Sequence, residues 1–246
     1  AKRVSVHGLD LYSLNNSIGA VLDYLGRVDP TAAEAARVRY SCFSPWEMDP
    51  ATYGRAAVSG RMKACEQEAV ATLADLLQER MEYLANDGEA FFDAERNATV
   101  IREAERYYRT MYYGSRESWN LRDRHMFDTL RSVLQHRGQH ARAVVWAHNS
   151  HVGNAAATEM GMRGEVNIGQ LARERFGPAA YTIGFGTHHG AVAAASNWDD
   201  PMQVMTVRPS HEDSYERLCH DSGVTSFLLH LRAPRDEAVR EAPVSY

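Results

Sequence analysis

One stretch decides the expected fold: Ala143-Val144-Val145-Trp146-Ala147-His148-Asn149-Ser150-His151-Val152-Gly153-Asn154. It begins as an unbroken apolar run and then presents two histidines, an amide and a hydroxyl within four residues. Strands of parallel α/β sheets are buried on both faces and present functional groups at their carboxyl ends. We therefore predict that residues 143–147 form a buried strand and that the polar residues after it lie at the edge of a functional site.

Segments with strand and helix patterns alternate along the rest of the chain. Further strands are predicted from short apolar runs, at residues 4–7, 181–185, 204–207 and 224–231. Helices are predicted from apolar residues at helical spacing, at residues 14–25, 30–39, 119–135 and 167–176. Two long helical segments, which Asn86-Asp87-Gly88 separates, are typical of an antiparallel helical hairpin.

These patterns predict an α/β fold: a mostly parallel sheet flanked by helices, with a long helical-hairpin insert. We expect residues 1–246 to form one α/β domain that is incomplete at its N-terminus, with residues 30–114 as the helical insert. Helix starts are expected at Asp29-Pro30 and at Asn167, where a side chain suited to an N-cap begins a helical pattern. Ser210 to Asp213 has the spacing of a capping box and predicts a helix through Leu218.

Composition and charge restrict the class of partner. The 246 residues carry a formal net charge of −5 and no basic tract, which argues against nucleic acid. No apolar run approaches the roughly 20 residues that a membrane-spanning helix needs, so no membrane partner is expected. The three cysteines, Cys42, Cys65 and Cys219, are widely spaced and form no C-x-x-C pair. This pattern favours reduced, buried thiols in a cytoplasmic protein.

His148 and His151 are the strongest candidates for chemistry. Three residues apart on a turn or a first helical turn, their imidazoles can converge on one point. Imidazole suits general acid–base catalysis at neutral pH, and helix N-terminal amides after it would favour a developing oxyanion. The alternative is that one histidine has a structural hydrogen bond and the other is exposed. From these residues alone, both interpretations stand equally.

Two other kinds of catalytic site have less support. The H-x-x-H spacing differs from the H-E-x-x-H pair of zinc hydrolases, and we expect no metal and no cofactor in this chain. His188, His189 and Asp10 could complete a metal shell only if their strands were neighbours. Ser150 lacks the G-x-S-x-G elbow of serine hydrolases and is a poor candidate for a nucleophile.

Arg122 and Asp10 are candidates because of their positions. Arg122 lies early in the helix before the histidine strand, where a guanidinium can bind a carboxylate or polarise a carbonyl. A surface ion pair of Arg122 and Asp123 is the better interpretation from these two residues alone. Asp10 directly follows a predicted strand and is therefore better placed for a site than most carboxylates of the chain.

Several segments together resemble the erythromycin esterase family, which includes succinoglycan biosynthesis-like proteins. The most telling matches are Arg122-Asp123-x-x-Met126 and Ala147-His148-Asn149-x-His151. The matching segments follow one another over nearly the whole chain, at Gly8-Leu9-Asp10-Leu11-Tyr12-Ser13-Leu14, Trp119-Asn120-Leu121-Arg122-Asp123-Arg124-His125-Met126, residues 144–153, Asn167-Ile168-Gly169-Gln170-Leu171 and Tyr181-Thr182-Ile183-Gly184-Phe185.

The resemblance implies an α/β core with a helical insert and a deep cleft. It further implies hydrolysis of a small-molecule ester or lactone, such as a macrolide lactone, by a histidine-activated water without a covalent intermediate. Carried over by position, the expected catalytic residues are His148, His151 and Arg122. The expected substrate-binding residues are Asp10, Asn149, Tyr12 and His188.

The sequence departs from the family pattern in one motif. The family has a Gly-Glu-x-x-His segment that supplies a water-activating histidine, whereas neither Gly88-Glu89 nor Gly164-Glu165 is followed by such a histidine. We expect this chain to be the C-terminal two-thirds of a family member, without that base. Losing a general base typically lowers a rate by about 10²- to 10⁴-fold. Two other classes stay open: a ligand-binding module of the same fold that does no chemistry, and a metal-dependent hydrolase.

Overall fold

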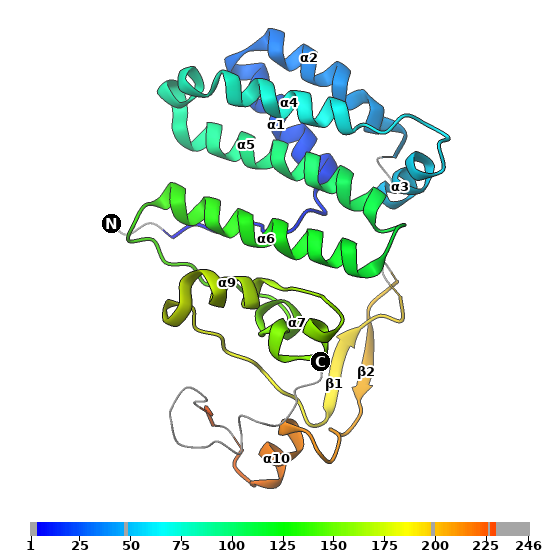
Figure 1. Cartoon of the computed structure of the whole chain (residues 1–246), viewed down its shortest axis with the longest axis vertical. Helices are drawn as coiled ribbons and strands as arrows, with labels where there is room; N and C mark the ends of the chain where they lie inside the picture. The colour runs from blue at the N-terminus through cyan, green and yellow to red at the C-terminus, as the bar shows by residue number, and fades with distance from the viewer. Residues whose placement is uncertain (1–3, 47–48, 198–199, 226, 230–246) are drawn as a thin grey trace.

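The computed structural model describes residues 4–46, 49–197, 200–225 and 227–229, and most of its regular structure is helical (Figure 1). The helices of the first part are α1 (Leu14–Val28), α2 (Pro30–Tyr40), η1 (Ser41–Trp46), α3 (Pro50–Val58), α4 (Glu66–Gln78), α5 (Arg80–Thr110) and α6 (Ser115–Arg137). The second part contains α7 (Asn149–Val152), η2 (Ala155–Ala157), α8 (Glu159–Met162), α9 (Ile168–Phe176), η3 (Gly177–Ala179), β1 (Gly190–Ala194), β2 (Gln203–Val207) and α10 (Tyr215–Asp221).

Helices α1 to α5 pack around one hydrophobic core. Both α1 and α4 lie along α5, and α2 packs on each of them (Figure 1). Apolar residues at helical spacing, such as Val21 and Leu25 of α1 and Phe91 and Ile101 of α5, are almost fully buried there. Helices therefore make up most of the described part of the predicted insert of residues 30–114, and α1 shares their core. The division of the chain at residue 30 stays a prediction.

The predicted break at Asn86-Asp87-Gly88 is confirmed. Asp87 has non-helical backbone angles, φ −155° and ψ 98°, inside the span of α5. Its carboxylate accepts hydrogen bonds from the backbone N–H groups of Glu89 (3.1 Å) and Ala90 (3.0 Å), so it caps the long second half of α5. The preceding helical segment, predicted as continuous through Leu84, is itself divided, because α4 ends at Gln78.

Helix α6 joins this helical unit to the rest of the molecule. One side of α6 faces α5, and the other side packs against α9 (Figure 1). Met126, Phe127 and Leu130 of α6 and Ile168 of α9 are the buried members of a second, smaller core. The helices predicted at residues 119–135 and 167–176 are thus confirmed, and α6 becomes a wall shared by two cores.

The expected mostly parallel sheet is not found in the described residues. Their only strands are β1 and β2, an antiparallel pair in which Gly190 lies opposite Val207. The strand predicted at 204–207 corresponds to β2, but residues 4–7, 143–147 and 181–185 form no ladder. A parallel strand needs neighbours along its edges and cover on both faces. Here Val144 and Trp146 are at least 90% exposed, so those neighbours are missing.

Two further predictions concern the C-terminal part. In the strand predicted at 224–231, residues 224, 225 and 227–229 are not in a strand, and the others lie outside the described residues. The helix predicted to start at the Ser210 capping box begins later, at Tyr215, where the Ser214 side chain accepts from the backbone N–H of Arg217. The N-caps predicted at Asp29 and Asn167 are confirmed, because their side chains accept from the N–H groups of Ala32 and Gln170.

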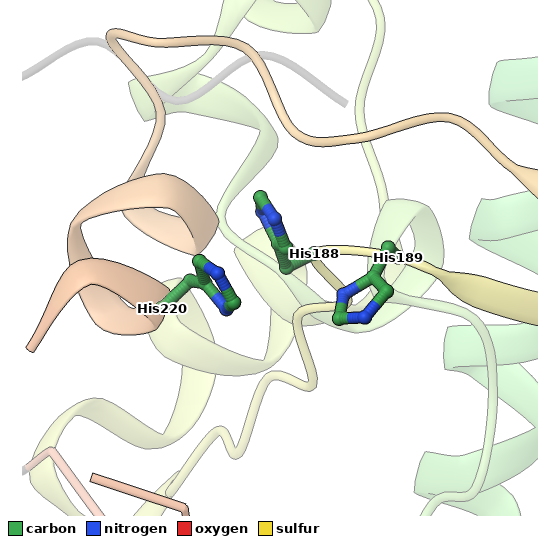
Figure 2. Close-up of side chains that lie close together, drawn as sticks. All are labelled: His188, His189 and His220. Atoms are coloured by element: carbon green, nitrogen blue, oxygen red, sulfur yellow. The ribbon is translucent and has the colours of Figure 1, made fainter. Parts of the chain in front are cut away.

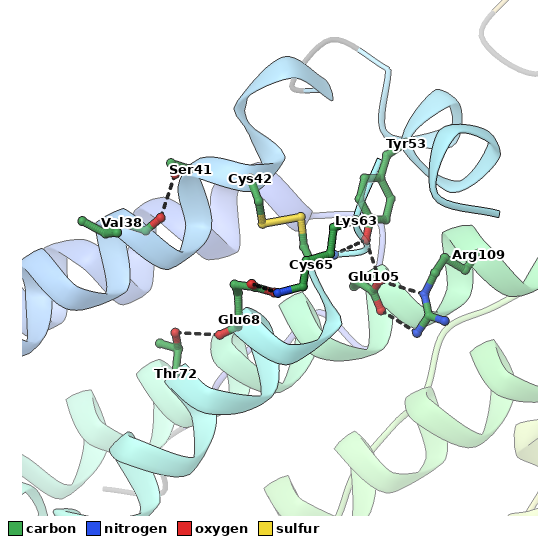
Figure 3. Close-up of a disulfide and its surroundings, with 10 residues drawn as sticks. All are labelled: Val38, Ser41, Cys42, Tyr53, Lys63, Cys65, Glu68, Thr72, Glu105 and Arg109. Atoms are coloured by element: carbon green, nitrogen blue, oxygen red, sulfur yellow. Dashed lines mark hydrogen bonds and ion pairs between the residues drawn. A yellow bond between two sulfur atoms is a disulfide. The ribbon is translucent and has the colours of Figure 1, made fainter. Parts of the chain in front are cut away.

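A disulfide between Cys42 and Cys65 corrects the expectation that the cysteines are reduced (Figure 3). Cys42 lies in η1 and Cys65 caps α4, and the packing of α2 on α4 brings their Cα atoms to 6.0 Å across 23 positions of sequence. The hydroxyl of Tyr53 supports the bridge: it accepts from the Cys65 N–H (2.8 Å) and donates to Glu105 (2.6 Å). Cys219 remains a free thiol.

The disulfide also bears on the expected compartment. Disulfides persist mainly in oxidising compartments, so the argument from reduced cysteines to the cytoplasm loses its premise. The cytoplasmic location therefore stays a prediction. Within the described ranges, the helices include none with both the length and the apolar character to cross a membrane.

We expect the disulfide to stabilise the fold by about 3 kcal/mol, because it closes a loop of about two dozen residues in the unfolded chain. Replacing both cysteines (Cys42→Ala with Cys65→Ala) should lower the free energy of unfolding, measured by urea titration, by that amount. Dithiothreitol should destabilise the wild type equally and leave the double variant unchanged, and Cys219→Ala serves as the control. Three free thiols in the denatured, unreduced protein would contradict the assignment.

Candidate active site

Arg122 and Asp10 form a two-point ion pair at the start of the candidate site. The Arg122 Nε donates to Asp10 Oδ1 at 3.0 Å, and Nη2 donates to Oδ2 at 2.6 Å. The pair joins α6 to the segment before α1, which is 112 positions away in sequence. The guanidinium also lies over the Tyr12 ring, 4.7 Å from its centroid, and the Tyr12 hydroxyl bonds that of Tyr107 at 3.0 Å. Three predicted site residues are therefore in direct contact.

The ion pair fixes the charge of both partners. Partial burial by itself would raise the pKa of Asp10, but the Arg122 guanidinium holds it below its usual value. Partial burial would lower the pKa of Arg122, and the Asp10 carboxylate raises it instead. A charge on His151 also contributes to lowering the pKa of Asp10. The pair is therefore ionised at neutral pH and interacts electrostatically with the neighbouring histidine.

The next residue of α6, Asp123, holds the second predicted histidine. Its side chain is fully buried, and both carboxylate oxygens lie 3.0 Å from Nδ1 of His151. One of them also accepts from the backbone N–H of Ile168 at 3.2 Å. Burial raises the pKa of Asp123, and its hydrogen bond with His151 opposes that shift. A buried carboxylate oriented on an imidazole is the standard means of fixing the tautomer of an acid–base histidine.

Trp119 completes the support of His151. The two rings stack with their centroids 4.7 Å apart and an angle of 5° between their planes. The Trp119 indole N–H donates to the Val166 carbonyl at 2.8 Å, which fixes the ring that carries the stack. Only 12% of the His151 side chain is exposed. With Nδ1–H donated to Asp123, the Nε2 atom of His151 keeps a lone pair for accepting a proton.

His148 is held in the opposite tautomer. It caps α7, and its Nδ1 accepts a hydrogen bond from the backbone N–H of Ser150 at 3.2 Å. The Ser150 hydroxyl lies 2.9 Å from the same nitrogen. An accepting Nδ1 places the ring proton of the neutral imidazole on Nε2, as assigned from these hydrogen bonds. The exposed Nε2–H of His148 is thus a donor, whereas Nε2 of His151 is an acceptor.

Hydrogen bonds between asparagine side chains and the backbone hold the segment that carries the two histidines. The Asn149 amide donates to the Phe185 carbonyl at 2.6 Å and accepts from the Phe185 N–H at 3.3 Å. The buried Asn167 side chain donates to the Ser150 carbonyl at 2.7 Å. Gly169 allows α9 to approach α7 closely, since a Cβ there would lie 1.9 Å from the Gly153 carbonyl oxygen. Asn149 therefore has a positioning role in this structure, and its prediction as a substrate-binding residue stays a prediction.

His188 lies in a separate group. Its ring stacks on His220 and stands next to His189, and among the described residues no contact links it to Arg122 or His151. Loss of solvent lowers the pKa of His188, and the two neighbouring imidazoles add to the shift. The metal shell considered for His188, His189 and Asp10 is not formed, because Asp10 is engaged with Arg122. Binding of substrate by His188 stays a prediction.

The structure thus brings Asp10, Tyr12 and Arg122 together. Asp123, the residue after Arg122 on α6, contacts His151. Sequence reasoning missed Asp123 and Trp119, the two residues that orient His151. Asp123 was named in the Arg122-Asp123-x-x-Met126 match, but no site role was assigned to it. A signal was present, since Trp119 and Asp123 lie one helical turn apart and share a face of the predicted helix.

His125 lies two residues beyond Asp123 on α6 and is 95% buried. Its Nε2 has no hydrogen-bond partner among the residues described. Burial lowers the pKa of His125, and the charges of Glu103 and Asp10 partly oppose this shift. His125 is therefore a neutral histidine beside the site, with a polar atom that the protein leaves unpaired.

Comparison with known proteins identifies the family of this chain. The family model described as erythromycin esterase matches residues 1–244. The chain therefore belongs to the erythromycin esterase family, as the sequence segments indicated.

A solved structure shows the same fold. The crystal structure described as a succinoglycan biosynthesis protein superposes with a TM-score of 0.68 at 20% sequence identity. The match covers 85% of this chain and 49% of the other, so the chain spans about half the length of that protein.

The buried His125 predicts a pH dependence of stability. Below its ordinary pKa of about 6.5, the unfolded chain binds a proton there that the folded chain still excludes. The free energy of unfolding should therefore fall as the pH drops from 7.5 to 5.5, and His125→Phe should remove up to about 1.4 kcal/mol per pH unit of that slope. Urea unfolding at several pH values measures it.

The exposed His140 provides the matched control, because His140→Gln should retain the wild-type slope. Identical slopes for His125→Phe and the wild type would contradict a buried neutral histidine at position 125.

Proposed function

We propose that this site hydrolyses an ester bond of a small molecule, such as a macrolactone, with a water activated by His151, which takes the role that the family resemblance gives to the histidine of a Gly-Glu-x-x-His segment. The observation that carries the proposal is the Asp123–His151 pair: a fully buried carboxylate 3.0 Å from Nδ1, with Nε2 left as the proton acceptor. Membership of the erythromycin esterase family supports hydrolase chemistry. The ester or lactone class of substrate is part of the proposal.

In the proposed reaction, Nε2 of His151 takes a proton as the water oxygen attacks the carbonyl carbon. The carbonyl π electrons move onto oxygen, and the ester C–O bond then breaks. The departing alkoxide takes the proton from His151, so the products are one carboxylic acid and one alcohol. Asp123 stabilises the imidazolium while it exists, as the buried carboxylate of a catalytic triad does.

Two donors are available for the developing oxyanion. Among the described residues, Nη1 of Arg122 has no protein hydrogen-bond partner, since the Asp10 pair uses only Nε and Nη2. The Nε2–H of His148 is the second donor. Preorganised donors of this kind commonly contribute several kcal/mol to the stabilisation of a tetrahedral intermediate. In the proposal, His151 is therefore the base, and Arg122 and His148 are the two oxyanion donors.

Asp123→Asn should lower kcat by about 10²- to 10⁴-fold with little change in KM, because the amide favours the wrong tautomer of His151. His151→Gln should abolish turnover. The assay follows opening of a macrolide lactone, and of a panel of simpler carboxylic esters, by the gain of one water in the mass spectrum. It is run on this chain and on any longer natural form that contains it. His140→Gln is the matched control.

Circular dichroism and thermal unfolding verify that each variant is folded. Unchanged turnover in folded His151→Gln would contradict the proposal. Ligand stabilisation of the protein without product in any form would support the non-catalytic binding module instead. Turnover that is lost on chelation and restored by zinc would support the metal-dependent class and remove the water-activating role from His151.

A further inference from the structure

Three histidines meet at a place that the proposed reaction does not use. His188 and His189 come from the loop before β1, and His220 comes from the last turn of α10 (Figure 2). One ring nitrogen of each can be chosen so that all three lie within 4.8 Å of one another. Within the described residues, this is the only group of three or more potential metal-binding side chains of this kind.

The fold holds the first of these histidines on both its backbone and its side chain. Just beyond the β1–β2 ladder, the Ser210 N–H donates to the His188 carbonyl at 3.0 Å. The Ser210 hydroxyl lies 2.6 Å from the His188 Nδ1. Metal-binding histidines are typically oriented by such a contact on the ring nitrogen that does not bind the metal. His188 is therefore prepared to present Nε2.

The other two histidines approach His188 from different directions. The ring of His220 stacks on that of His188 with centroids 3.6 Å apart, and His189 stands edge-on at 5.0 Å. His189 and His220 are exposed, whereas His188 is half-buried. The ring of His188 is thus held in place, whereas the exposed rings of His189 and His220 have space to rotate.

The spacing is within reach of a tetrahedral metal ion. Zinc–nitrogen bonds of about 2.0–2.1 Å place two ligand nitrogens about 3.4 Å apart. The nitrogens of the three rings must therefore approach by little more than 1 Å at most. A metal lies in the plane of each imidazole that binds it, so the stacked His188 and His220 rings must also tilt apart. Rotation of the exposed His189 and His220 side chains satisfies both conditions.

We propose that His188, His189 and His220 together bind one divalent transition-metal ion of the zinc class, with a water as the fourth ligand. Imidazole nitrogen favours Zn²⁺ over Mg²⁺ and Ca²⁺, which prefer oxygen ligands. The sequence analysis predicted no metal for the chain, and the present proposal departs from that prediction because His220, which completes the group, was not considered there. The ion would tie the loop before β1 to α10, through His188 and His189 on one side and His220, about 30 positions later, on the other.

The surrounding charges permit a cation. Arg217 lies on the same helix and would repel it, but its guanidinium is paired with Asp221 through Nε–Oδ2 at 2.8 Å. The ion pair is neutral as a unit. It therefore leaves the three imidazole lone pairs as the main determinant of what binds.

The test is a titration of the complete, untagged and chelator-treated chain with Zn²⁺ by calorimetry. One ion per chain should bind, and elemental analysis after gel filtration should retain it. His189→Gln and His220→Gln should each weaken binding at least about 10-fold, since even indirect partners of metal ligands have effects of that size. Both positions are exposed, so the variants should remain folded by thermal unfolding.

Two controls separate this proposal from others. His140→Gln removes an exposed histidine elsewhere and should bind Zn²⁺ like the wild type. His151→Gln should also retain the ion, so that failure of the esterase proposal leaves this one intact. Co²⁺ should give the spectrum of a four-coordinate ion in the wild type and lose it in His220→Gln. Substoichiometric binding, or equal weakening by His140→Gln, would overturn the site.

Discussion

A fully buried carboxylate needs hydrogen-bond donors, and Asp123 obtains them from two other elements of the structure. It accepts from His151 of α7 and from the backbone N–H at the start of α9, so one side chain of α6 fixes both elements. Leaving a buried charge without partners costs several kcal/mol, which makes this arrangement strongly preferred. The orientation of the catalytic candidate is therefore a by-product of satisfying a buried charge. Trp119, one turn earlier on α6, adds the stacked surface that limits rotation of the imidazole.

Consecutive residues of α6 also place two carboxyl groups in contrasting surroundings. Asp10 faces a guanidinium and has a lowered pKa, whereas Asp123 lies in a more buried position and has a raised pKa. Pairs of titratable groups whose environments separate their pKa values are typical of acid–base sites. Here the separation arises because Arg122 and Asp123 point to different partners from adjacent positions. Helix α6 thus supplies the guanidinium beside Asp10 and, one residue later, the buried carboxyl group beside His151.

The sequence predicted the residues whose chemistry is visible in their type and spacing. The helix break at Asp87 and the caps at Asp29 and Asn167 are confirmed, whereas the functional roles of His148, His151, Arg122 and Asp10 stay predictions. A role for Asp123 and the Cys42–Cys65 disulfide were not predicted, because burial and proximity across 23 or more positions depend on packing that spacing does not reveal. His220 was missed for the same reason, since the contact with His188 exists only after α10 folds back on the hairpin. The apolar runs were interpreted as strands, and among residues 4–7, 143–147, 181–185 and 204–207 only the last lies in a strand, because pairing into a sheet is a property of several segments together.

The residues of the candidate site differ in how firmly the structure holds their backbone. Asp10 follows residues 4–7 and His148 follows residues 143–147, two extended segments whose apolar side chains face solvent. The backbone at both positions is therefore set by segments that lack the ladder hydrogen bonds and burial that normally fix a strand. Arg122, Asp123 and Trp119, in contrast, project from a helix with cores on both sides. His151 is thus oriented by Asp123 and Trp119 of this helix, and not by the apolar residues 143–147 that precede it. In the Arg122–Asp10 pair the helix again determines the geometry, because the Arg122 guanidinium positions the carboxylate of Asp10, which follows residues 4–7.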